Sequence, residues 1–357
     1  MTRTENNILL FSITMCWSAA YIFIKTLPPD LSTYAYLTLT TGIASVVLVA
    51  IFWRQLKKIT GRMVKKAGVL SLVLTIDMVL NKEGIGLLSA SNASFLSALT
   101  IIVVPLLMLL LRVKPTKNNR VVRKLQFQNN FLKKTHFCRA EFFKVNFEKV
   151  EARKNAGLVR QPTGLPNKSN MLGALIIVLG LGLTSRFAIS GFKNMGTLFM
   201  LLGCLSGAVY TIASCRFAKE ENPLLIGIVQ MIFTALSGFA LWLIEEPSTF
   251  LSIEYTRPLL SSIFILAFFT RAYAYIMLMF SQKYASPINV TVIASTEPVI
   301  TLLFAVMIPA AFGGTEKLTL FSLSGAMIIA LGAVVAGTDF LQQKEKTEKE
   351  AECKSAG

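Results

Sequence analysis

The feature that most constrains this chain is a series of long apolar stretches. A helix needs about 20 predominantly apolar residues to cross the ~30 Å hydrocarbon core of a bilayer. Only 15% of the residues are charged and 54% are hydrophobic, whereas a soluble domain carries about 25% charged residues. A single soluble core cannot bury so many apolar helices, so we expect an all-α, polytopic membrane protein.

Ten stretches are interpreted as transmembrane helices. The first has no small-residue cleavage site after it, so we expect a retained helix rather than a signal peptide. Short polar connections join most neighbouring stretches, which favours antiparallel packing in one bundle. The predicted spans are residues 7–25, 34–53, 67–88, 95–111, 171–183, 195–213, 224–244, 259–280, 288–311 and 318–337.

Basic residues are distributed unequally between the two sides that these spans define. With the N-terminus inside, the connections after even-numbered spans and the tail hold most lysines and arginines. Cytoplasmic loops next to spans carry the excess of positive charge, so we expect both termini to lie in the cytoplasm, in a multi-pass protein of a bacterial cell (plasma) membrane. The other side receives only Lys25, Lys82, Arg186, Lys193, Arg257 and Lys317.

Three pairs of similar segments indicate an internal repeat. Residues 173–180, Gly-Ala-Leu-Ile-Ile-Val-Leu-Gly, match residues 325–332, Gly-Ala-Met-Ile-Ile-Ala-Leu-Gly, 152 positions further along. Weaker matches pair residues 89–101 with 286–298 and residues 16–24 with 204–212. Five spans in each half would invert the second half relative to the first, because an odd number of crossings reverses the topology.

The two halves differ in a long basic segment between the fourth and fifth spans. The spacing of matched segments falls from 197 to 152 residues there, so roughly 45 residues are extra. Residues 112–170 hold fifteen lysines and arginines against three glutamates, about +12 of the formal charge of +17. We divide the chain into a first repeat with spans one to four (1–117), a basic cytoplasmic insertion (118–168), span five (169–194), a second repeat (195–338) and a polar cytoplasmic tail (339–357).

Aromatic and basic side chains alternate within the insertion. Three interpretations stay open: a poorly ordered segment, an amphipathic helix lying on the anionic cytoplasmic leaflet, or a contact with nucleic acid or another partner. No RNA or DNA motif accompanies the pattern, so we expect no nucleic acid. His136 is the only histidine and the cysteines show no paired spacing, so we expect no metal, no cofactor and no disulfide.

Four motifs link the chain to a known family. They are Trp17-Ser-Ala-Ala-Tyr21, Ser89-Ala-Ser-Asn-Ala-Ser-Phe95, Gly196-Thr-Leu-Phe-Met-Leu-Leu-Gly203, and Tyr284-Ala-Ser-Pro287 with Glu297-Pro298. With these motifs the chain resembles the EamA family of the drug/metabolite transporter superfamily, over nearly everything except residues 118–168.

The resemblance implies ten helices in two inverted five-helix repeats. It also implies transport of amino acids or other small metabolites, often outward, by alternating access. Two features depart from the family pattern: the long basic insertion, and Ile101 where first repeats often carry proline. The motifs say nothing about which substrate is carried.

Few charged residues lie inside predicted spans, where each costs about 2.5–3.5 kcal/mol at a helix centre, and two of them are the clearest cases. They are Asp77 in the third span and Arg271 in the eighth. The repeat equates Arg271 with Leu74, one helical turn from Asp77, so we expect the two charges at similar depth, in a buried ion pair. The pair could sense a zwitterionic substrate or a coupling proton, or it could simply tie the two halves together.

Glu297 is the third intramembrane ionisable residue of interest, and it directly precedes Pro298. Proline removes one backbone hydrogen bond and frees a carbonyl group. An acid beside such a kink could exchange a proton during transport. Alternatively, the Glu-Pro pair only bends the helix and its carboxylate lies in a water-filled vestibule.

Aromatic and amide side chains complete the candidate site, since solute cavities combine apolar walls with a few polar groups. For each of them alone, helix packing or a place in the interfacial aromatic belt is the competing interpretation. Asn92 and Asn289 occupy equivalent positions in the two repeats. The predicted substrate-binding residues are Trp17, Tyr21, Asp77, Asn92, Tyr210, Arg271, Tyr275, Asn289 and Glu297.

Three classes of function follow from this pattern. The leading hypothesis is a secondary transporter of small molecules, because repeats with sparse intramembrane polar residues suit a central alternating site. A membrane-embedded enzyme would need clustered acids, histidines or a nucleophile, so we expect no enzyme activity. A third possibility is a relative of the same fold that the insertion impairs or makes regulatory.

Overall fold

The computed structural model of this chain describes residues 3–28, 30–111, 168–184, 195–250, 253–308 and 320–337. Residues 112–167 and 338–357 lie outside the described residues. The predictions made for the basic insertion, including His136, and for the polar tail therefore stay predictions.

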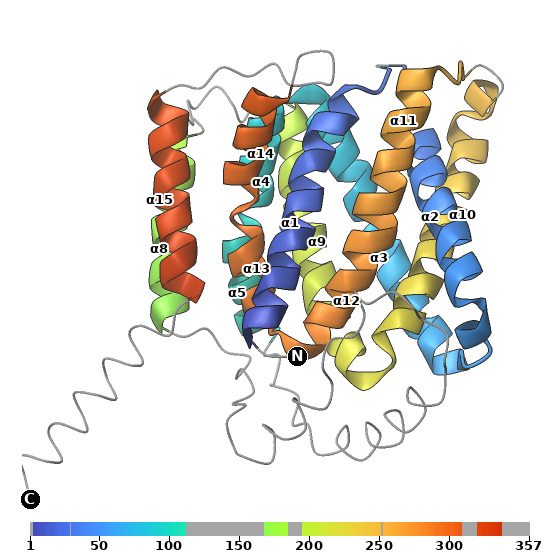
Figure 1. Cartoon of the computed structure of the whole chain (residues 1–357), viewed down its shortest axis with the longest axis horizontal. Helices are drawn as coiled ribbons and strands as arrows, with labels where there is room; N and C mark the ends of the chain where they lie inside the picture. Colours follow the sequence, from blue (N-terminus) through green and yellow to red (C-terminus); the bar gives the residue numbers. More distant parts are fainter. Residues whose placement is uncertain are drawn as a thin grey trace, which may run out of the picture.

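Helices make up the regular structure of the described residues, in which no strand occurs. Two short elements depart from α-helical geometry: η3 is a 3₁₀ turn and η4 is a π-helix. The elements, drawn in Figure 1, are α1 (Arg3–Lys25), α2 (Thr33–Leu56), α3 (Gly61–Leu87), α4 (Ala90–Ser97), α5 (Thr100–Leu110), α8 (Lys168–Thr184), α9 (Met195–Glu220), α10 (Pro223–Glu245), η3 (Pro247–Phe250), α11 (Arg257–Ile265), η4 (Leu266–Tyr273), α12 (Ala274–Tyr284), α13 (Pro287–Ala294), α14 (Glu297–Met307) and α15 (Leu320–Gly337).

Seven helical stretches among the described residues are long and apolar enough to cross a membrane. They are α1, α2, α4 with α5, α9, α10, α11 through α12, and α13 with α14. The apolar segments of α8 and α15 are shorter, and α3 is not among the seven. The all-α, membrane-spanning class predicted from the sequence is thus confirmed. A helix lies within each of the ten predicted stretches, but ten crossings remain a prediction.

Two of the seven stretches are each broken into two helices. The breaks fall at residues 98–99 and 295–296. Both broken stretches begin with the same N-cap, in which the hydroxyl of Ser89 or Ser286 accepts a hydrogen bond of 3.2 Å from the backbone N–H three residues further on. Such a cap satisfies one of the orphan donors at a helix start.

Proline explains only one of these breaks. Pro298 is the second residue of α14, where its missing N–H costs no intrahelical hydrogen bond. The first half has Ile101 instead, yet α5 still begins at Thr100. There the Thr100 hydroxyl donates to the backbone carbonyl of Ser97 at 2.5 Å, so a side chain satisfies a polar group that the break exposes.

The two broken helices run alongside each other in opposite directions. α4 packs against α14, and α5 packs against α13, as the labels in Figure 1 show. Their breaks therefore meet at a similar depth in the bundle. Helix ends carry backbone polar groups and partial charges, so this meeting point is suited to polar contacts inside a membrane protein.

Helices α8 and α15 form a tight pair at one edge of the molecule (Figure 1). They contain the two matching glycine segments, and the contacts between these segments are reciprocal. A Cβ atom on Gly180 would lie 2.9 Å from the carbonyl oxygen of Gly325 and 2.9 Å from Ile329 Cγ1. On Gly332 it would lie 2.9 Å from the carbonyl oxygen of Gly173. The glycines thus permit close backbone approach, as in small-residue contacts of membrane helices.

An apolar cluster fills the region of the bundle near the first turns of α3 and the last turns of α9. It includes Ala67, Leu70 and Leu74 of α3, all fully buried, together with Cys215 and Ala218 of α9. The site described below lies toward the other end of the same two helices, and the cluster separates it from the end at which α3 begins.

Candidate functional site

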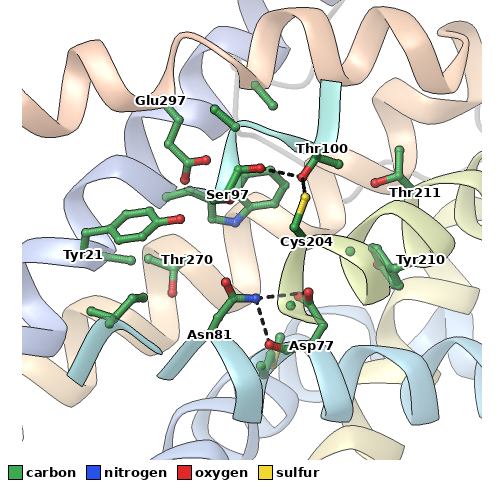
Figure 2. A pocket seen from close by; sticks show the side chains of 18 of the residues that line it. Tyr21, Asp77, Asn81, Ser97, Thr100, Cys204, Tyr210, Thr211, Thr270 and Glu297 are labelled. Atoms are coloured by element: carbon green, nitrogen blue, oxygen red, sulfur yellow. Dashed lines mark hydrogen bonds between the residues drawn. The ribbon is translucent and has the colours of Figure 1, made fainter. Parts of the chain in front are cut away.

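A cavity of about 160 Å³ lies where the breaks of the two broken helices meet α1, α3, α9 and η4 (Figure 2). On α1 and α3 its lining residues come from the C-terminal half, and on α9 from the middle turns, Gly203 to Thr211. Because α1 and α3 reach the cavity with one half only, the cavity does not run the full length of these helices. Lys82 lies at the end of the lining nearest to the C-terminus of α3, together with Ile85.

Asp77 is held by hydrogen-bond donors on two helices. Its Oδ1 accepts from Asn81 Nδ2 at 3.0 Å and from Ser206 Oγ at 3.1 Å. Asn81 lies four residues after Asp77 and so shares its face of α3. Two glycines of α9 make room for this pair: a Cβ on Gly207 would lie 3.1 Å from Asp77 Oδ1, and one on Gly203 would lie 3.2 Å from Asn81 Nδ2.

Arg271 projects from the π-helix η4 toward aromatic side chains. One terminal nitrogen donates to the Tyr36 hydroxyl at 2.7 Å. The guanidinium carbon lies 5.6 Å from the centre of the Tyr36 ring and 5.9 Å from that of Tyr275, which are cation–π distances. π-Helical turns are rare and often occur at functional sites.

The predicted ion pair between Asp77 and Arg271 is wrong. Both residues line the cavity, but among the described residues the ion pairs closer than 4.0 Å join Lys66 to Glu220 and Glu221, and Arg216 to Glu220. Asp77 instead takes neutral donors from α3 and α9, and Arg271 takes a neutral acceptor and two rings.

Glu297 opens α14 directly after the break and is only 6% exposed. Its backbone carbonyl accepts a hydrogen bond of 3.1 Å from Ser18 Oγ. Within the described residues, no donor or cation pairs with its carboxyl group. In Figure 2 this carboxyl group points into the space between Tyr21 and Ser97. The cavity therefore contains two carboxyl groups in different settings: that of Asp77 is solvated by protein donors and that of Glu297 is not.

Aromatic rings form one wall of the cavity. The Tyr275 ring lies 5.7 Å from that of Trp17 and 6.1 Å from that of Tyr210. The Tyr210 hydroxyl accepts a hydrogen bond of 2.8 Å from Gln230 Nε2 on α10, which fixes its polar end. Rings held in this way offer an apolar surface with defined polar edges.

Seven of the nine predicted site residues line this cavity: Trp17, Tyr21, Asp77, Tyr210, Arg271, Tyr275 and Glu297. The two asparagines do not. Asn92 is exposed in the first turn of α4, and Asn289 donates to Asn7 Oδ1 at 3.4 Å in the first turn of α13. Each asparagine lies three residues after a serine N-cap, at a helix start about two turns away from the break.

Several polar lining residues were not predicted. The sequence could have identified Asn81, since it lies one helical turn after Asp77 and so shares its face of the helix. Ser97 and Thr100 flank the break of the first half, and Thr100 Oγ1 lies 3.2 Å from Cys204 Sγ. No sequence pattern marked Tyr36 as a site residue, because only the packing of α2 brings it to Arg271. Among the described residues, no three His, Cys, Asp or Glu side chains gather as they would around a metal ion.

With this geometry in place, comparison with known proteins decides the family. Residues 6–121 and 194–338 match the family model described as "EamA-like transporter family". The chain belongs to this family. The family resemblance drawn from the four motifs is thereby confirmed, and EamA proteins are membrane transporters of the drug/metabolite superfamily.

Two further comparisons concern individual proteins. A solved crystal structure matches this EamA protein with 15% sequence identity and a TM-score of 0.64, over 96% of this chain and 99% of that chain. At that identity the match is evidence about the fold alone. No curated protein matches the sequence.

Proposed function

We propose that this protein is a secondary transporter, working as an exporter, that moves small metabolites such as amino acids across the bacterial cell membrane by alternating access. The observation that carries the proposal is the cavity where the two broken helices meet. Broken helices at membrane depth are the usual place for solute and ion sites in transporters. The cavity combines an aromatic wall with a few convergent polar groups, as small-molecule sites do. Export is the direction that the family resemblance favours.

The proposal includes ten crossings in two inverted halves, with both termini in the cytoplasm. Its first support is that the family model matches two separate stretches of the chain. Its second support is that both halves contain a broken helix with the same N-cap, and that these helices run in opposite directions. The symmetric glycine contacts between α8 and α15 are a third support.

A packed layer closes the bundle on one side of the cavity, which fits an alternating mechanism. The apolar cluster of Leu70 and Leu74 lies on one side of it, and beyond that cluster Lys66 bridges α3 to Glu220 of α9 at 2.8 Å. This layer would have to open for solute to leave on that side. Alternating access needs a closed layer of this kind on at least one side of the solute site.

We assign the coupling proton to Glu297 rather than to Asp77. A carboxyl group without protein donors gains little from staying ionised at membrane depth. Asp77 accepts hydrogen bonds from Asn81 and Ser206, which favours its charged form. Glu297 is therefore better arranged than Asp77 to take up and release a proton as access alternates.

Inside-out vesicles test the proposal most directly. Labelled amino acids and small metabolites are presented with and without a pH gradient, in vesicles with and without the protein. We expect uptake of at least one solute into inside-out vesicles, stimulated by the gradient. Glu297→Gln should abolish the stimulation, whereas the exposed Glu254→Gln should retain it. Equal uptake in vesicles lacking the protein would contradict transport, and an unchanged gradient response in Glu297→Gln would contradict the proton assignment.

A second candidate function is supported by the gap between the two matched stretches. Residues 122–193 fall outside the family match and include most of the basic insertion. The test compares the full chain with a variant lacking residues 118–168, reconstituted at equal amounts. Equal transport by both proteins would make the insertion a passenger. Transport that occurs only after the deletion would instead make this chain an impaired or regulated relative.

A further inference from the structure

The buried charge of Arg271 lacks a compensating carboxylate. Its side chain is only 8% exposed. A guanidinium group has five N–H donors. Among the described residues, the hydrogen-bond acceptor that it contacts is the Tyr36 hydroxyl, at 2.7 Å. The Nε atom is buried without any acceptor. Burying a charge that is not paired costs several kcal/mol, so this arrangement needs an explanation.

The other charged groups of the cavity do not supply that partner. Asp77 is more than 4.0 Å away and accepts from Asn81 and Ser206 instead. Lys82 is itself a cation, and its Nζ donates to the carbonyl oxygen of Leu31 at 3.3 Å. Glu297 forms no ion pair in the described residues. The guanidinium group of Arg271 therefore lines the cavity and has N–H donors that no acceptor in the described residues uses.

A second N–H donor, close to the Tyr275 ring that Arg271 also approaches, lacks an acceptor. Trp17 Nε1 is buried without a hydrogen-bond partner in the described structure. The Trp17 ring lies 5.7 Å from the ring of Tyr275, which is the ring 5.9 Å from the Arg271 guanidinium carbon. Two N–H donors without acceptors thus lie in residues that line the cavity, beside an aromatic surface. This combination suits a small anion attached to an apolar group.

We propose that Arg271 binds the carboxylate of the transported solute, and that Tyr36 is the positioning residue that orients its guanidinium group. This inference rests on the proposed transport function and names the chemistry of its solute at one end. A planar carboxylate fits the fork of a guanidinium group with two parallel hydrogen bonds. A dianionic phosphate fits less well, because Asp77 and Glu297 also line the cavity and would repel a second negative charge.

Binding to the purified protein tests the inference without requiring transport. Benzoate, benzamide and benzylamine share one ring and differ in charge, so they form a matched set of probes. Each is titrated while the thermal unfolding temperature is measured, since a ligand that binds only the folded state stabilises it. We expect benzoate to stabilise the protein, and benzamide and benzylamine to act independently of Arg271.

Arg271→Gln should weaken benzoate binding by about 10- to 100-fold, which corresponds to the ~1.5–3 kcal/mol of a hydrogen bond to a charged group. Arg62→Gln is the matched control, because it removes the same charge from an exposed position at the start of α3. It should bind benzoate like the unmodified protein. Benzoate binding that is absent from the unmodified protein, or unchanged in Arg271→Gln, would overturn the inference.

Tyr36→Phe keeps the charge of Arg271 and removes only the hydroxyl that orients it. We expect benzoate affinity to fall several-fold while the benzamide response stays the same. Arg271→Lys, which keeps the charge but loses the fork, should also bind benzoate more weakly. If Arg271→Gln does not fold, these two variants decide the matter, and unchanged benzoate affinity in both refutes the inference. Vesicle transport that fails for every solute while benzoate binding depends on Arg271 would refute the transport function alone.

Discussion

The contact between α8 and α15 yields a sharp prediction about helix packing, for which the chain contains its own control. Gly180 faces α15, where an added Cβ would lie 2.9 Å from the carbonyl oxygen of Gly325 and 3.0 Å from the backbone nitrogen of Ile329. Gly182, two residues further along the same helix, has no atom within 4 Å of its added Cβ. Alanine at the two positions therefore differs in packing but hardly in helix propensity.

The expected magnitude follows from these distances. Replacing glycine with alanine in a helix gains up to about 1 kcal/mol of propensity at either position. At Gly180 the added methyl group meets backbone atoms that cannot rotate away, and overpacking of this kind costs about 1–3 kcal/mol. We therefore expect Gly180→Ala to be less stable than Gly182→Ala by about 1–3 kcal/mol.

Reversible unfolding of the purified variants in mixed micelles, with an increasing fraction of denaturing detergent, measures this difference in free energy of unfolding. A second substitution refines the test. Adding Ile329→Ala to Gly180→Ala removes the side-chain contact at 2.9 Å but leaves both backbone contacts, so stability should not recover. Equal free energies of unfolding for Gly180→Ala and Gly182→Ala would refute the close packing of these helices.

Two other perturbations probe the link between α3 and α9. Gly207→Ala places a methyl group 3.1 Å from Asp77 Oδ1, so the carboxylate should shift and vesicle transport should fall by about tenfold, the effect of losing ~1.4 kcal/mol of binding. Gly42→Ala is the control, because there is open space around its Cβ, and this variant should transport normally. Equal losses in both variants would argue against a steric effect on Asp77. Lys66 and Glu220 form a 2.8 Å ion pair with partly exposed side chains, so a double-mutant cycle on unfolding free energy should give a coupling of about 0.2–1 kcal/mol. A coupling of zero would mean that this contact does not hold the two helices together.

Local patterns in the sequence predicted the features that depend on short stretches of chain. The helices fall within the apolar stretches because membrane solubility and backbone hydrogen bonding are both decided within about 20 residues. The break before Pro298 follows from the chemistry of a single residue. Most candidate site residues lie in the cavity, because polar groups inside spans gather where they avoid lipid.

Tertiary structure alone decided which side chains face one another. Equating Arg271 with Leu74 assumed a regular α-helix, but the π-helix η4 changes the rotation of the residues that it contains, and the expected pair with Asp77 does not form. Tyr36 becomes the partner of Arg271 only through the packing of α2, a helix far away in sequence. Apolar periodicity and helix caps are local quantities, whereas the rotation of one helix against another depends on many weak side-chain contacts made at once, which no single stretch of this sequence specifies.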